Sequence, residues 1–338
     1  MPGLCLYGTV LNSVNTVEAS IRSVYRPDAE IVVVDGGSRD GTYERLLELS
    51  KDYNVKVYRL PGSTRGRGRD YALRMCPEGS YAAYFDLDDE YNAYFHRAIE
   101  WGMATESQRP LYYLVKRDYA IARGGWRDLN YAEDIEFFTR VGFDYYLPLI
   151  TSRPVVRHWS SGRAEAQRYG RGSISRALRL IRMTIDDIRG GAYSFTEFAS
   201  TIRRAHYRLA SPLVYAAAAA MGIYRNAEGV SNKVAYFRAV LERLVNPVEA
   251  IGADPADVIV IVEYLPALRL GLGWAAGRIA AAGLSPLVCK MDTRDALVGV
   301  GSEEAVRRWP RAPLHSCKTI AVTSPAPTLS SRSFHDHS

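Results

Sequence analysis

The chain has 338 residues, of which 47% are hydrophobic and 24% are charged. This composition excludes a disordered protein and suffices for one large domain or two ordinary ones with a sizeable core. Basic side chains exceed acidic ones by six, which favours an anionic partner such as a nucleotide, a phosphorylated lipid or a membrane surface.

The first half of the sequence alternates short apolar runs with amphipathic stretches, a pattern typical of strands and helices around a mostly parallel sheet. Four strands are expected, at Leu4 to Val10, Glu30 to Asp35, Val55 to Leu60 and Tyr81 to Phe85. Helices are expected to follow the first three strands, at Val14 to Tyr25, at Thr42 to Tyr53 and, after a basic glycine loop from Pro61 to Asp70, up to Met75.

Four further elements are expected before residue 165. They are a helix at Asn92 to Gly102, a hairpin or two strands at Pro110 to Gly124, a helix at Leu129 to Phe143 and a short strand at Arg153 to Ser160. Residues 1–165 are therefore predicted to form one α/β nucleotide-binding domain, with a Rossmann-like, mostly parallel sheet flanked by helices.

The second half has a different character. Long patterns rich in Arg, Ala and Leu predict a helical region over residues 166–250, with helices at Ser173 to Arg189, Ser194 to Tyr224 and Asn232 to Leu244. Residues 251–309 are predicted to be a small α/β element of unknown role, with strands at Val258 to Tyr264 and Pro286 to Met291 around a helix at Ala267 to Ala282. Residues 310–338 are rich in Ser, Pro and Thr, and we predict a disordered tail.

Cysteine spacing and apolar runs bear on location. The four cysteines lie far apart, at positions 5, 76, 289 and 317, and their spacing predicts neither a zinc site nor a disulfide framework. Without a recognisable secretory signal, a reducing cytoplasm is the expected compartment.

The longest apolar run, Leu209 to Tyr224, is shorter than the roughly 20 residues of a membrane span. It predicts a buried or interfacial helix, with peripheral contact at the cytoplasmic face of the membrane as the alternative.

Polar side chains follow the ends of the predicted strands. Asp35 ends the second strand, the basic loop follows the third, and Asp86 and Asp88 follow the fourth. The carboxyl ends of parallel strands meet at one edge of a sheet, where α/β proteins bind ligands. A nucleoside diphosphate with Mg²⁺ or Mn²⁺ would match both signs of charge, whereas a solvated turn is the simpler interpretation of the carboxylates.

Three segments follow one another along this half of the chain: VVVDGGSRDGT, then RGRGRDYALRMCPEGSYAAYFDLDD, then GGWRDLNYAEDIEFF. In this order they resemble the family 2 glycosyltransferases of the GT-A fold, which show a strand ending in Val-Asp-Asp/Asn-Gly-Ser-x-Asp-Gly-Thr, an Asp-x-Asp motif and a later Glu-Asp pair. The resemblance covers about Leu4 to Trp159. It implies an inverting enzyme that uses a nucleotide-sugar donor and a divalent metal.

The resemblance implies a role for several residues around the donor. Asp35 matches the aspartate that recognises the nucleotide base, and Asp86 and Asp88 match the Asp-x-Asp pair that binds the diphosphate through Mn²⁺ or Mg²⁺. His158 occupies the place of a further metal ligand. The remaining residues expected at the nucleotide are Thr9, Asn12, Gly37, Arg67 and Arg69.

On the acceptor side, the resemblance implies that Asp134 is the general base, with Glu133 beside it. Asp89 and Trp126 are expected to contact the acceptor, which is a sugar, a glycan or a lipid phosphate. We expect no nucleic-acid partner, and the sequence does not predict the oligomeric state. Asp134 also fits an ordinary acid in the first turn of a helix, and Asp35 an ordinary turn residue.

Three departures from the family pattern narrow the prediction. Gly36 stands where relatives have a second aspartate, and Arg69-Asp70 stands where they often have Arg-Asn. The Gln-x-x-Arg-Trp motif of processive synthases is absent, so a polymerising enzyme is not expected. One rival function is a sugar-phosphate nucleotidyltransferase, but the glycine-rich loop with Arg that usually follows the first strand in those enzymes is absent from this sequence. The other is a non-catalytic nucleotide-binding or membrane-associated scaffold.

Overall fold

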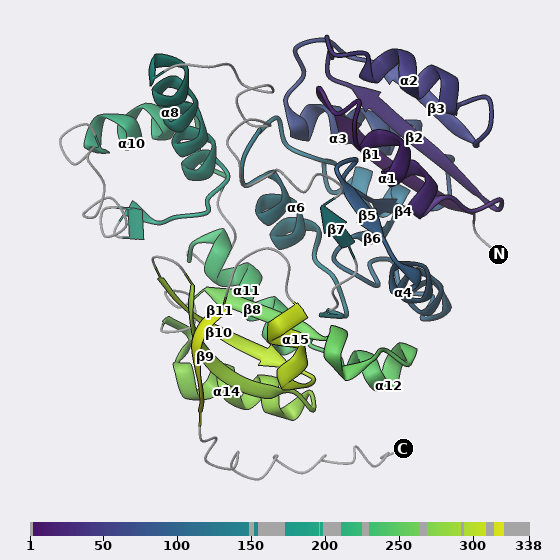
Figure 1. The fold of residues 1–338 in the computed structure, drawn as a ribbon. Helices are drawn as coiled ribbons and strands as arrows, with labels where there is room; N and C mark the ends of the chain where they lie inside the picture. The colour runs from purple at the N-terminus through teal and green to yellow at the C-terminus, as the bar shows by residue number, and fades with distance from the viewer. Residues whose placement is uncertain are drawn as a thin grey trace, which may run out of the picture. The chain divides into compact units, whose positions relative to one another are not determined.

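The computed structural model describes residues 3–148, 152–154, 173–195, 197–198, 211–224, 230–263, 269–291, 294–308 and 314–320. The chain divides into two compact units, Met1–Ala253 and Asp254–Ser338, and each is described by itself. Figure 1 gives the course of the chain through both units. Residues 166–250, predicted to be a separate helical region, belong to the first unit.

The first unit is built on a five-stranded sheet with the order β3-β2-β1-β4-β6. The strands β1 (Leu4–Val10), β2 (Ala29–Asp35), β3 (Val55–Arg59) and β4 (Tyr81–Tyr84) run parallel, and β6 (Leu114–Lys116) pairs antiparallel with β4. β1 and β2 are buried along almost their whole length, because helices cover a parallel sheet on both faces. The predicted mostly parallel α/β fold is confirmed.

Six helices of this unit lie between β1 and β7 in the sequence. In α1 the buried residues recur at helical spacing, so one stripe faces the sheet while the rest is solvated. Their bounds are α1 (Val17–Val24), α2 (Thr42–Leu49), α3 (Arg65–Met75), α4 (Ala93–Ala104), α5 (Arg117–Ala122) and α6 (Glu133–Val141).

The basic glycine loop predicted between Pro61 and Asp70 is mostly helix. Thr64 caps α3 by accepting a hydrogen bond from the Arg67 N–H at 3.1 Å. The two glycines allow close packing: a Cβ on Gly66 would lie 1.9 Å from the Arg127 carbonyl oxygen, and one on Gly68 would lie 2.3 Å from Thr9 Oγ1. The glycines that suggested a loop therefore let α3 approach the chain on two sides.

Two other local predictions are corrected. The hairpin predicted over Pro110 to Gly124 is the short strand β6 followed by α5. The carboxylates after β4 lead into a strand, β5 (Asp89–Tyr91), which pairs antiparallel with β7 (Ser152–Pro154). Glu90 is therefore a strand residue, since cross-strand pairing outweighs the local turn preference.

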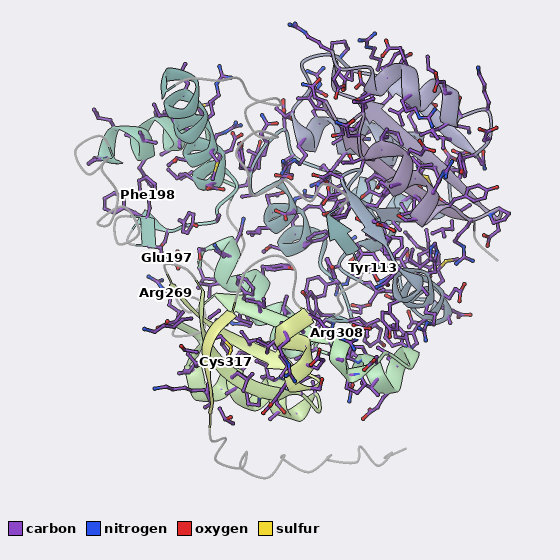
Figure 2. The ribbon with its side chains drawn as sticks, viewed as in Figure 1. Tyr113, Glu197, Phe198, Arg269, Arg308 and Cys317 are labelled. Carbon is purple, nitrogen blue, oxygen red and sulfur yellow. A yellow bond between two sulfur atoms is a disulfide. The ribbon has the colours of Figure 1, made fainter. Side chains whose placement is uncertain are left out.

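The first unit ends in helices with the bounds α8 (Ser173–Arg189), α10 (Ser211–Ala220), α11 (Asn232–Glu242) and α12 (Pro247–Ile251). Of these, α8 and α10 pack on each other, whereas α11 packs on α6 and α12 on α4. Figure 1 shows α8 and α10 side by side, and Ile188, Phe198 and Ala218 form the buried contact between them. Glu197, labelled next to Phe198 in Figure 2, accepts the Ser231 hydroxyl at 3.2 Å and so ties this helical pair to the start of α11. Much of the helix predicted over Ser194 to Tyr224 lies outside the described residues.

The second unit is a four-stranded antiparallel sheet with the order β11-β9-β10-β8. Its strands are β8 (Ile259–Glu263), β9 (Ser285–Met291), β10 (Arg294–Val300) and β11 (Leu314–Thr319). Its helices are α14 (Leu272–Ala281) and α15 (Glu303–Arg308), preceded by the 3-10 turn η2 (Pro255–Asp257). β11 falls within the predicted disordered tail, because its pairing with β9 orders a segment whose polar composition gave no strand signal. Among the described residues, no helix has the length and apolar character needed to cross a membrane.

All four cysteines are paired, which corrects the expectation that no disulfides form. Cys5 of β1 is bonded to Cys76 at the end of α3, and Cys289 of β9 is bonded to Cys317 of β11. The partners are 71 and 28 residues apart in sequence, so only the packing of α3 on β1 and of β11 on β9 brings them together.

The Cys5–Cys76 bond predicts a stability change that depends on its oxidation. In the chain-entropy model, a cross-link across 71 residues lowers the conformational entropy of the unfolded chain, and this stabilises the folded state by about 4 kcal/mol. We expect Cys76→Ser to lower the free energy of unfolding of the oxidised protein by an amount of this order, measured by urea titration. A reducing agent should destabilise the wild-type protein by breaking this bond, whereas the variant has no such bond to lose. Peptide mapping that finds Cys5 and Cys76 as free thiols in the air-oxidised protein would contradict the pairing.

Candidate active site

The carboxyl ends of β1, β2 and β4 lie at the same edge of the sheet, because these strands are parallel. Val10 pairs with Asp35 at this edge, and the loops that follow are joined to each other. The Asn12 N–H donates to Ser38 Oγ at 2.8 Å, and Asn12 Oδ1 accepts the Arg39 N–H at 2.9 Å. Asn12, expected at the nucleotide, therefore fixes the two loops against one another.

Asp35 is fully buried, and its carboxylate organises the turn after β2. It accepts the N–H groups of Gly37 and Ser38 at 3.0–3.2 Å, and Arg59 Nε lies 3.4 Å from Asp35 Oδ2. Gly37 has a φ of 99°, and a Cβ there would lie 3.1 Å from Pro61 Cα. Both residues thus have a clear structural role, and their contact with a nucleotide stays a prediction.

Thr9 lies at the end of β1 beneath α3. Its hydroxyl donates to the Val34 carbonyl at 3.0 Å, and its side chain occupies the space that the missing Cβ of Gly68 leaves. Arg67 is exposed on α3 and is available to an anion, whereas Arg69, two residues on, is buried.

Arg69 is the centre of the site. Its side chain is only 3% exposed, with Nη2 2.8 Å from Asp86 Oδ1 and Nη1 2.8 Å from Glu133 Oε1. The guanidinium also lies 4.4 Å from the centre of the Tyr84 ring and 5.0 Å from that of Trp126. One cation thus joins the segment after β4 to the start of α6, which are far apart in sequence.

The charges around Arg69 set the protonation states of its neighbours. Burial alone would lower the pKa of Arg69, but Tyr84, Asp86, Glu133 and Asp134 together raise it above its ordinary value, so the guanidinium stays charged. Burial raises the pKa of Glu133, which is 2% exposed, while Arg69 and Arg65 oppose that rise. Glu133 Oε2 is buried without a hydrogen-bond partner. Glu133 is therefore the counter-ion of Arg69.

Asp86 is held on several sides. Its backbone N–H donates to the Tyr91 hydroxyl at 2.9 Å, and its carbonyl oxygen accepts the Ser20 hydroxyl at 3.0 Å. Burial raises the pKa of Tyr84, whose hydroxyl stays protonated and donates to Asp86 Oδ2 at 3.3 Å. The Asp86 side chain is still 40% exposed, so it is both positioned and open to solvent.

The metal site predicted at Asp86 and Asp88 fits hard cations in the type of its donors. Asp88 is partly buried next to Asp86, and both offer carboxylate oxygens. Within the described part of the chain, no three or more His, Cys, Asp or Glu side chains are grouped to hold a metal. A magnesium ion in a nucleotide site is usually held by one or two carboxylates together with the phosphates, and this pair fits that pattern. His158, the third predicted ligand, lies outside the described residues.

Asp134 lies in the first turn of α6, which begins after Ala132 with a φ of 56°. Asp134 Oδ1 accepts the Ile135 N–H at 2.8 Å, and the side chain is partly exposed. Its charge raises the pKa of both Arg69 and Tyr84. The role of Asp134 as the general base stays a prediction.

The two residues predicted to contact the acceptor are buried. Trp126 is 4% exposed, stacks on Phe137 with ring centres 4.0 Å apart, and donates its indole N–H to the Tyr7 hydroxyl at 3.0 Å. Asp89 is 8% exposed within β5. Their contact with an acceptor stays a prediction.

Asp70 is a supporting residue whose role the sequence did not reveal. Its carboxylate accepts the Trp126 backbone N–H at 2.9 Å and pairs with Arg74 at 2.7 Å. A Cβ on Gly125 would lie 1.9 Å from Asp70 Oδ1, so the glycine makes room for this contact. The departure from the Arg-Asn pattern thus anchors the loop that carries Trp126.

Asp187 of α8 is a second residue that the sequence did not single out. Burial raises its pKa to about 7, Lys233 opposes the rise, and Asp186, Glu133 and Asp134 add to it. In the sequence, Asp186 and Asp187 form an Asp-Asp pair, and their local pattern does not indicate that the pKa of Asp187 is raised.

The neighbour of Asp187 shows how α8 reaches the site. Asp186 Oδ2 accepts the Asn130 N–H at 3.0 Å, just before α6 begins. The end of α8 therefore lies against the loop that leads to Glu133 and Asp134.

A parallel sheet with carboxylates and a buried arginine beyond its strand ends defines a Rossmann-like α/β domain. Residues 9–101 match the model of the family described as "Glycosyl transferase family 2". The resemblance found in the sequence is confirmed over these residues. The match includes Asp35, Asp86 and Asp88 and ends before Asp134.

Three solved structures are similar to the chain at low sequence identity. S. aureus TarS has a TM-score of 0.42 and 14% identity, over 73% of this chain and 51% of that one. S. aureus TarS 1–349 in complex with UDP-GlcNAc has 0.42 and 15%, over 73% and 85%. Mannosyltransferase PcManGT from Pyrobaculum calidifontis in complex with GDP-Man and Mn²⁺ has 0.37 and 19%, over 83% of each chain. The chain thus spans about half the length of full TarS, and no curated protein sequence matches it.

Arg69 predicts a large stability effect. Removing one partner of a buried ion pair leaves an uncompensated charge and costs about 3–5 kcal/mol. We expect Arg69→Met to lower the free energy of unfolding by this amount in urea titration, and a further Glu133→Gln substitution to restore part of it. Arg67→Met is the matched control on the same helix, because Arg67 is exposed, and it should change stability by less than about 0.5 kcal/mol. Equal stability of the two single variants would show that the network contributes nothing.

Asp187 predicts a pH dependence of stability. Its folded pKa of about 7 lies above the unfolded value, so its favourable contribution is complete below about pH 4 and is lost as the pH rises through 7. Each pH unit between the two values is worth about 1.4 kcal/mol before solvent access reduces it. Asp187→Asn should therefore gain stability over the wild type between pH 5 and pH 8 in urea titration.

The control for this pH effect is Asp118→Asn. A hydrogen bond from Arg117 lowers the pKa of Asp118, so the relative stability of this variant should fall as the pH rises from 3 to 5 and then stay level. An Asp187→Asn effect that is the same at pH 5 and pH 8 would contradict the raised pKa.

Proposed function

We propose that the chain transfers a sugar from a nucleoside-diphosphate sugar to an acceptor hydroxyl or a lipid phosphate, in one displacement with inversion. The observation that carries this proposal is the pair of 2.8 Å contacts through which Arg69 joins Asp86 to Glu133. They bring a donor-side carboxylate and the Glu-Asp pair of α6 to one place. The family match of residues 9–101 supports sugar transfer as the reaction class.

The donor half of the proposal rests on Asp86, Asp88 and exposed Arg67. Asp86 is held in place by Arg69 and Tyr84 while part of its carboxylate faces solvent. A divalent cation bound by Asp86 and Asp88 would stabilise negative charge on the leaving diphosphate. Arg67 would add a positive charge near the phosphates without the cost of moving a buried group.

The acceptor half rests on Asp134. Its carboxylate takes the proton of the acceptor hydroxyl while that oxygen forms a bond to the anomeric carbon. The bond from this carbon to the diphosphate oxygen breaks at the same time, and its electron pair leaves with the nucleotide. Attack from the face opposite the leaving group inverts the configuration. Glu133, bound to Arg69, keeps the start of α6 in position and takes no part in the proton transfer.

Asp134→Asn tests the base assignment. An amide does not accept the proton, so we expect kcat to fall by about 100-fold or more while nucleotide binding is retained. The assay follows nucleotide release from UDP-GlcNAc, GDP-mannose and other donors, with Mn²⁺ or Mg²⁺ and with sugar, glycan or polyprenyl-phosphate acceptors. Glu44→Gln is the matched control, since Glu44 is also a first-turn acid, on α2, and is exposed.

The same assay separates the rival functions. Asp88→Ala should abolish metal-dependent turnover. If the wild type and this variant release nucleotide at equal rates without metal, the proposed donor site is rejected. Release of pyrophosphate from a nucleoside triphosphate and a sugar phosphate would identify a nucleotidyltransferase. Tight nucleotide binding without turnover of any donor would identify a scaffold.

A further inference from the structure

The helix α10 carries an exposed apolar stripe. Its members recur at the spacing of one helix face and continue one residue past the helix end; they are Leu213, Ala216, Ala217, Ala220 and Met221, and we call them the outer stripe. Leu213 is 74% exposed and Met221 58% exposed. An uncovered stripe of this kind on a water-soluble surface indicates a partner.

The opposite face of α10 is already in use. Val214, Tyr215 and Ala218 pack on Ile188 and Phe198 in the contact with α8. The sequence of α10, SPLVYAAAAA, contains no charged residue. A helix that is apolar all round is normally covered on every side, so the outer stripe calls for a second apolar environment.

Other large apolar side chains of the helical pair are exposed as well. Leu178 and Ile181 of α8 and Phe195 are exposed, and so is Arg182 of α8. Of the nine large hydrophobic side chains exposed among the described residues, five fall between positions 178 and 221. The exposed apolar surface is therefore concentrated in this part of the chain.

The charge of this part identifies its partner. Residues 163–228 contain eleven arginines, no lysine and five acidic residues, an excess of six. This equals the net charge of the whole chain, so the remaining sequence is neutral overall. An arginine-rich segment that also carries an apolar stripe matches an anionic lipid surface, to which each arginine near the headgroups contributes about 1 kcal/mol. A second copy of the chain would bring the same positive charge and is disfavoured.

The length of α10 gives its orientation. Ten residues at 1.5 Å each extend about 15 Å, half the hydrocarbon thickness of about 30 Å. A helix of this length lies in the plane of the interface, with its apolar face among the acyl chains.

We propose that the α8–α10 pair docks the protein onto an anionic bilayer surface through the outer stripe of α10. The stripe inserts among the acyl chains, and the exposed Arg182 of α8 contacts the lipid phosphates, within a segment that is positively charged overall. Glu197 with Ser231, and Asp186 with Asn130, connect this pair to the rest of the first unit. The docking does not depend on sugar transfer and is tested without a donor.

The test is co-sedimentation of the full chain with vesicles of phosphatidylcholine alone or with about 30% phosphatidylglycerol. We expect binding to the anionic vesicles, at least about tenfold weaker binding to the neutral ones, and release in high salt. Leu213→Glu with Met221→Glu should abolish binding, because two carboxylates replace the stripe's largest side chains. Leu47→Glu with Trp274→Glu is the matched control, since both residues are exposed and lie outside the helical pair.

Several outcomes would overturn the proposal. They are failure of the wild type to bind anionic vesicles, equal binding to both vesicle types, and undiminished binding by the stripe variant. A lipid-free dimer in light scattering that the stripe variant abolishes would assign the stripe to a second copy instead. Far-UV circular dichroism checks folding of the variant; if it does not fold, the salt and lipid dependence of the wild type decides the question.

Discussion

The first unit depends on one positive charge that has been taken out of water. Arg69 lies between Asp86 and Glu133, and a buried guanidinium is tolerated only when carboxylates and hydrogen bonds compensate it. That requirement works in both directions. The arginine needs the two acidic segments close by, and the two segments, which would repel each other, approach only because the arginine lies between them.

The surrounding packing serves the same constraint. Tyr84 and Trp126 offer ring faces to the guanidinium, and Phe137 stacks on Trp126 to hold it there. Gly66 and Gly68 bring α3 close enough for the contact. Taken singly, these residues resemble ordinary core residues. Together they form one arrangement that packs around Arg69 and stabilises its charge.

Sequence reasoning placed β1 to β4 and α6 well, since buried parallel strands and amphipathic helices leave strong local patterns. It proposed Asp86, Asp88 and Asp134 as site residues through motif order, and their roles stay predictions. It misplaced α3, because glycine signals a loop unless the packing partner is known, and it missed the disulfides and β11, which depend on distant pairing. Trp126 was assigned to the acceptor for its chemistry, whereas its burial follows from Asp70 and Phe137, which local patterns do not reveal.

Arg69 and Asp70 are neighbours on α3, yet they hold different segments: one binds the carboxylates, and the other binds the loop at Trp126. A helix turns by 100° per residue, so adding or removing one residue after Thr64 would swing both side chains away from their partners. The number of residues between Thr64 and Arg69 is therefore more strictly constrained than the identity of those residues. We therefore expect this segment to accept a substitution at the exposed Arg67 but no insertion or deletion.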